Sequence, residues 1–268
     1  SCFFTNRENM MNRVLAILTA GTMVLSTNVF AQDATIGGEV SLDFSEQTSG
    51  DWGGKMGVDV DVDSAAGGVA LDFSATDGGD LTLDNWTVGT SLSGVALAFG
   101  DDNGLMPGAE GEQTLAAPAM TESLQLSVGA ASVAVGFTDW TSDITDISNV
   151  QGAYTLGTAV SDVTISGDMN LGTDNIVLGA EIAGVDLGAA SIGGAVTYDM
   201  DAELFGFETV VKTDSIVSYL NGDQDDLLQN IGAEYTYNVS SSVDLTAGTN
   251  YNLDSEDLTP TVGLSFNF

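Results

Sequence analysis

Carboxylates at alternating positions are the first feature of this sequence that could do chemistry. Asp59, Asp61 and Asp63 are each separated by one residue, as are the first ligands of a calcium-binding loop. Such a loop also needs Gly at its sixth position and Glu at its twelfth, where this chain has Ser64 and Ala70. The spacing is instead that of a β-strand, in which alternate side chains share one face. We therefore interpret these acids as one face of a strand rather than as a calcium site.

The elements that position these acids form a predicted β-hairpin over residues 55–76. Asp72 continues the acidic face in the second half of this segment, after a break of small residues at 64–68. The opposite face is apolar throughout and comprises Met56, Val58, Val60, Val62, Val69, Leu71, Phe73 and Ala75. A period of two on both sides of a tight turn predicts two antiparallel strands with one acidic and one apolar face.

The same alternation recurs along the chain and predicts about sixteen strands, which makes the fold class all-β. In the fourth strand the alternation slips, because the apolar positions change from odd at Leu83 to even at Trp86. The slip indicates either a β-bulge near Asp84 and Asn85 or an inward Trp86.

Links of unequal length separate the predicted strands. Residues 47–54 and 140–149 are predicted loops, and a vaguer strand pattern at Val185 is interpreted as the lead-in to the eleventh strand. Residues 101–121 show no strand pattern and contain two of the three prolines of the chain. A structureless stretch of that length inside a regular array is usually functional or disordered.

The composition excludes several classes of function. The chain has 39 acidic and 4 basic residues and a net charge of −35, whereas nucleic-acid binding needs clustered cations. It contains no His, which removes Ser-His-Asp catalysis and His-ligated metal sites. Its single cysteine, Cys2, cannot form an internal disulfide. We therefore expect no enzymatic activity, no cofactor and no nucleic-acid partner.

The first 31 residues differ from the rest of the chain. Asn12 and Arg13 form a short positive region, residues 14–25 are apolar, and a small residue, Ala31, ends the segment. An apolar run of this length is short for a membrane span and typical of a secretory signal peptide. We predict that residues 1–31 are a cleaved signal peptide with upstream residues, and that residues 32–268 form one domain.

Two architectures explain alternating strands in an exported chain. A soluble sandwich packs its apolar face inward, whereas a membrane barrel turns that face to lipid and lines a lumen with the polar one. Strands of roughly ten residues fit a tilted membrane crossing, and a closed barrel satisfies every strand edge, as lipid demands. The chain also ends inside an apolar strand. The sequence therefore predicts a transmembrane antiparallel β-barrel of about 16 strands.

A family resemblance rests on the C-terminus and on one internal segment. Aromatic residues stand at the last and third-last positions, and residues 79–104 read GDLTLDNWTVGTSLSGVALAFGDDNG. With the signal peptide and the long segment after the fifth strand, these features resemble Gram-negative general porins. The resemblance implies an inward-folded third loop, about residues 102–121, that narrows the barrel. It also implies an assembly signal for the outer-membrane assembly machinery, formed by Leu264, Phe266 and Phe268.

The sequence departs from that family in two places. The family's arginine cluster opposite the acidic loop has no counterpart, because Lys55 and Lys212 are the only cations after the predicted signal peptide. The short turn at 77–80 stands where the family often has a longer loop that latches a neighbouring subunit. A homotrimer is one possible assembly, and outer-membrane lipid is an expected partner.

The predicted site residues fall into two sets. The predicted pore wall is the acidic strand face and comprises Glu39, Asp43, Asp59, Asp61, Asp63 and Asp72. The predicted pore constriction loop contributes Asp101, Asp102, Glu110 and Glu112. The alternative for the constriction residues is a mobile or solvated surface loop, or a weak divalent site at its start. A passage lined by one sign of charge concentrates counter-ions, so we expect a preference for cations.

These observations predict an outer-membrane channel for the passive diffusion of ions and small hydrophilic solutes. The alternative is a non-transport outer-membrane or exported β-rich protein with a structural or adhesive role. Strand number separates the two, because about eight strands leave an interior filled by side chains and about sixteen leave a channel.

Overall fold

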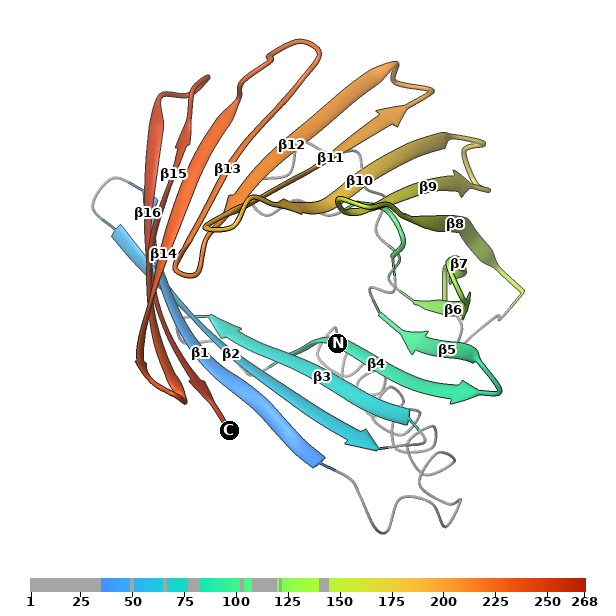
Figure 1. Ribbon diagram of the computed structural model, residues 1–268, viewed down its shortest axis with the longest axis horizontal. Helices are drawn as coiled ribbons and strands as arrows, with labels where there is room; N and C mark the ends of the chain where they lie inside the picture. The colour runs from blue at the N-terminus through green and yellow to red at the C-terminus, as the bar shows by residue number, and fades with distance from the viewer. Residues whose placement is uncertain are drawn as a thin grey trace, which may run out of the picture.

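The computed structural model describes residues 35–48, 51–64, 67–76, 82–101, 104–107, 120, 122–139 and 145–268. Within these residues the strands form one closed antiparallel barrel, in which neighbours in sequence pair and β1 pairs with β16 (Figure 1). The strands are β1 (Thr35–Thr48), β2 (Asp51–Ser64), β3 (Gly67–Thr76), β4 (Thr82–Leu92), β5 (Val95–Gly100), β6 (Ser123–Val128), β7 (Ala131–Phe137), β8 (Ile147–Gly157), β9 (Asp162–Asn170), β10 (Ile176–Asp186), β11 (Ser191–Asp199), β12 (Leu204–Lys212), β13 (Ile216–Asp223), β14 (Asn230–Ser240), β15 (Val243–Asn252) and β16 (Asp257–Asn267). The predicted all-β barrel of about 16 strands is confirmed.

Large apolar side chains stand on the outer face of the wall. Leu178 of β10 pairs with Tyr198 of β11, and these side chains are 49% and 39% exposed. The opposite face carries the fully buried polar side chains, such as Gln151 and Thr197, and is the inner face. The period of two in the sequence therefore becomes an apolar exterior and a polar interior.

The opening hairpin and the slip in the fourth strand are both as the sequence indicates. Residues 55 and 76 face each other across β2 and β3, as do residues 64 and 67. Between β3 and β4, Asp72 faces Asn85 but the next residue, Phe73, faces Leu83, so Asp84 is the extra residue of a β-bulge. The bulge returns Trp86 to the same face as its partner Leu71, and the alternative of an inward Trp86 is wrong.

Two predicted links are corrected by the structure. Most of the predicted loop at 47–54 is strand, because Gly53 and Gly54 pair with Ser45 and Phe44 although glycines show no alternation. Val185 belongs to β10 rather than to the eleventh strand, after a register irregularity that begins at Ile182 and obscures the pattern. The longest link, residues 101–122, follows β5, as expected.

The C-terminal residues close the ring against β1. Phe266 faces Val40 in the register. The Gly38 N–H donates to the Phe268 carbonyl at 3.2 Å, and the Phe268 N–H donates to the Gly38 carbonyl at 3.0 Å. The Phe268 ring crosses Gly38 so closely that a Cβ there would lie 2.8 Å from the ring. Among the described residues, no helix is long and apolar enough to cross a membrane.

Candidate pore lining

Three carboxylates stand side by side on the inner face of β1, β2 and β3. Glu39 faces Asp59, and Asp59 faces Asp72. Side chains directly opposite in an antiparallel pair have Cβ atoms about 5 Å apart, at which like charges repel. On β4 the row ends at Asn85, whose Nδ2 donates to Asp72 Oδ2 at 3.5 Å. The row therefore concentrates acidic groups on this part of the inner wall.

The other predicted wall residues lie on the same face. Asp61 and Asp63 follow Asp59 at alternate positions of β2 and are exposed, although they belong to the inner face of a closed barrel. Asp43 faces Lys55 across β1 and β2, and both are exposed as well. The inner face is therefore open to water at these residues.

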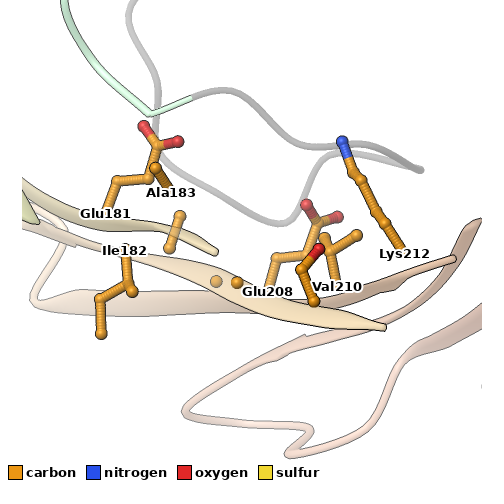
Figure 2. Close-up of a pocket in the computed structure, with 10 residues that line it drawn as sticks. Glu181, Ile182, Ala183, Glu208, Val210 and Lys212 are labelled. Atoms are coloured by element: carbon orange, nitrogen blue, oxygen red, sulfur yellow. The ribbon is translucent and has the colours of Figure 1, made fainter. Parts of the chain in front are cut away.

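A second acidic wall, which the sequence analysis did not select, lies on β10, β11 and β12. Glu181 faces Ala195, and Ala195 faces Glu208. Figure 2 shows the side chains of Glu181, Glu208 and Lys212 on one side of the sheet and Ile182 on the other. These three charged residues line a cavity of about 80 Å³. Both acids flank outward apolar residues, so the alternation that revealed β2 could also have found them.

The row of Glu208 continues as a ladder of amides. Glu208 faces Asn221 of β13, Asn221 faces Asn230 of β14, and Asn230 faces Asn252 of β15. Asn252 Nδ2 donates to Asn230 Oδ1 at 2.9 Å, and Asn230 Nδ2 donates to Asn221 Oδ1 at 3.0 Å. Asn221 and Asn230 are almost fully buried, so their hydrogen bonds offset the cost of burying amides.

Part of the link after β5, which is the predicted third loop, contacts the inner wall. The Leu105 N–H donates to Oε1 of the fully buried Gln151 at 2.6 Å. A Cβ on Gly179 of β10 would lie 2.6 Å from Pro107 Cδ and 3.1 Å from Met106 Cε. These contacts place residues 104–107 against the inner face of β8 and β10. The course of residues 108–119 lies outside the described residues, so the inward fold of the whole loop stays a prediction.

The predicted constriction residues are only partly within the described chain. Asp101 is at the start of the link, where its N–H donates to the Trp86 carbonyl at 2.8 Å. Asp102, Glu110 and Glu112 lie outside the described residues. The predicted signal peptide, residues 1–31, lies outside them as well.

The three residues of the predicted assembly signal all belong to the strand that closes the barrel. Phe266 and Phe268 are 40% and 63% exposed on the outer face, and Leu264 faces Leu42 of β1 on that face. In the part of the chain that the structure describes, no group of three His, Cys, Asp or Glu side chains could hold a metal ion.

The known proteins most informative for this geometry are porins. Neither a protein-family model nor a curated protein matches the sequence. A mutant of Rhodopseudomonas blastica porin matches the structure with a TM-score of 0.61 at 12% identity, over 88% of this chain and 100% of that one. A triple mutant of the same porin matches with a TM-score of 0.60 at 11% identity, with the same coverage of both chains.

A further structure, described as "Asymmetric conductivity of engineered proteins", has a TM-score of 0.60 at 12% identity and the same coverage. Likeness at such low identity concerns the fold. The fold is that of a porin, a closed sixteen-strand antiparallel barrel, and at this level the resemblance to general porins is confirmed.

Proposed function

We propose that this protein is an outer-membrane channel through which ions and small hydrophilic solutes diffuse passively, with a preference for cations. The observation that carries the proposal is the exposure of charged side chains inside a closed wall. Asp43, Asp61, Asp63 and Glu181 face inward and are nevertheless exposed. A barrel filled by its own side chains would bury them, whereas sixteen strands leave an aqueous channel.

The charge of the inner wall supports the preference for cations. The acidic row on β1–β3 and the acids of β10 and β12 line different parts of the ring. Lys55 and Lys212 are the only cations among the described residues. One sign of charge in a passage with walls of low dielectric constant attracts counter-ions and repels co-ions. Glu110 and Glu112 add to this field if the third loop folds inward.

The outer face supports a membrane location. Large apolar side chains cover strands on both halves of the barrel, with Ile165 54% and Tyr237 55% exposed. Closure leaves no edge strand among the sixteen described strands, as crossing a hydrocarbon layer requires. We infer a bacterial outer membrane, reached by way of a cleaved signal peptide and the barrel assembly machinery, with lipid around the barrel and a homotrimer as a possible assembly.

Conductance across a planar lipid bilayer tests this proposal. The purified mature protein should insert and produce discrete steps of current in KCl, and it should migrate differently on a gel before and after boiling. A folded, heat-modifiable barrel that inserts without conducting would reject the channel and leave a structural role.

A further inference from the structure

A hollow of mixed polar and apolar lining in the inner wall at β13–β16 points to a solute class. Two rows of inward residues bound it. In one row Tyr219 faces Gly232, which faces Asn250; in the next, Glu234 faces Gly248. Each row thus contains one glycine. Gly248, together with Tyr219, Glu234 and Asn250, lines a cavity of about 220 Å³.

The aromatic ring forms one side of this cavity. The Tyr219 ring crosses Gly232 so closely that it occupies the space a Cβ there would need. Gly248 lies in the next row, where a Cβ would be 2.7 Å from the Thr261 hydroxyl and 3.5 Å from Glu234 Cβ. The cavity therefore presents a phenol ring beside one glycine and a carboxylate beside the other.

The spacing of the ring and the carboxylate fits a small organic cation. The Tyr219 ring lies over Gly232, and Glu234 is two residues further along the same strand. The backbone positions of Gly232 and Glu234 are therefore about 6.8 Å apart. An aromatic face attracts ammonium groups, and methylated ammonium groups in particular. A volume of 220 Å³ is below the ~300 Å³ of sites for drug-sized ligands, so the cavity admits a head group rather than a large solute.

We propose that this cavity, lined by Tyr219, Glu234, Asn250 and Thr261, binds the methylated ammonium group of small organic cations as they pass through the lumen. The inference rests on the proposed channel function and names one class of solute for it. Lys212 stands in the same row as Glu234, on the far side of Val217, but it does not line the cavity.

Block of single-channel potassium current by tetramethylammonium chloride tests the proposal on the mature protein in a bilayer. Wild type should show a saturable block. Tyr219→Leu should raise the half-blocking concentration about fivefold, as loss of a cation–π contact implies, and Tyr219→Phe should retain the block. Glu234→Gln should weaken it as well. Tyr235→Leu removes a tyrosine from the outer face of the same strand and should leave it unchanged.

Glu181→Gln separates a site from a general effect of charge. It removes one inward carboxylate on β10 and should lower cation preference without changing the half-blocking concentration. The inference would be overturned if wild type showed no block, or if Glu181→Gln and Glu234→Gln weakened the block equally. It would also be overturned if Tyr219→Leu weakened block by a neutral sugar but not block by tetramethylammonium. Conductance and reversal potential are measured separately from the block. A protein that conducts and prefers cations but shows no Tyr219-dependent block would reject the cavity alone, and a protein that does not conduct would reject the proposed channel. Heat-modifiable migration confirms that each variant is folded.

Discussion

The contact between the link after β5 and the inner wall gives a prediction with a definite magnitude. Gln151 is fully buried, and its Oε1 accepts the Leu105 N–H at 2.6 Å. Gln151→Leu replaces the amide by an apolar side chain and removes the acceptor. An unsatisfied donor costs about 1–3 kcal/mol, which shifts the ratio of undocked to docked loop by about 5-fold to 150-fold. We expect the ratio of time spent at additional conductance levels to time spent at the main level to be higher in the variant than in wild type by that factor.

Single-channel recording at fixed voltage measures these levels. Gln125→Leu is the matched control, because Gln125 lies on the same inner face and donates instead to Ser127 of its own strand, at 3.2 Å. Gly179→Val approaches the same contact from the other side, since a Cβ there would lie 2.6 Å from Pro107 Cδ. If Gln151→Leu and Gly179→Val are both folded and show the same conductance levels as Gln125→Leu and wild type, residues 104–107 do not hold the loop, and the reasoning is wrong.

Three further perturbations address stability, assembly and selectivity. Asn230→Leu breaks the buried amide ladder and should lower the free energy of unfolding by about 1–3 kcal/mol, read as a lower urea midpoint; an unchanged midpoint would contradict the ladder's role. Phe268→Ser should lower the amount of protein in the outer membrane, and Gly38→Val should lower the temperature at which the barrel loses its heat-modifiable form; normal amount and temperature would argue against the terminal latch. The double variant Glu110→Gln, Glu112→Gln should reduce cation preference, and an unchanged preference would assign selectivity to the wall.

The alternation in the sequence was enough to predict the barrel and to locate the slip in β4, but it left a bulge and an inward Trp86 as alternatives. In β1, β2 and β3, which have a clear period of two, the acidic positions Glu39, Asp59 and Asp72 share the inner face. The prediction was weaker where side chains carry no pattern. Gly53 and Gly54 pair in the ladder like any other residues, but nothing in their side chains marks them as strand.

The composition of the candidate site depended on register, which the sequence did not determine. That Glu39, Asp59 and Asp72 form one row follows from which residues pair across three strands. The arrangement around Tyr219 likewise depends on register, which sets Gly232 opposite Tyr219 and Gly248 opposite Glu234. Which residues fall opposite one another depends on the register of each strand pair around the ring. A slip of one residue would turn each side chain of a strand to the other face.

The reversal potential under a gradient of KCl tests the central claim most directly. The claim predicts a potential shifted toward that of potassium, because an acidic inner wall excludes chloride more strongly than potassium. The shift should shrink at high salt, where the charges are screened, and as the pH falls and carboxyl groups take up protons. A reversal potential at zero, or one shifted toward chloride, would contradict a cation-preferring channel.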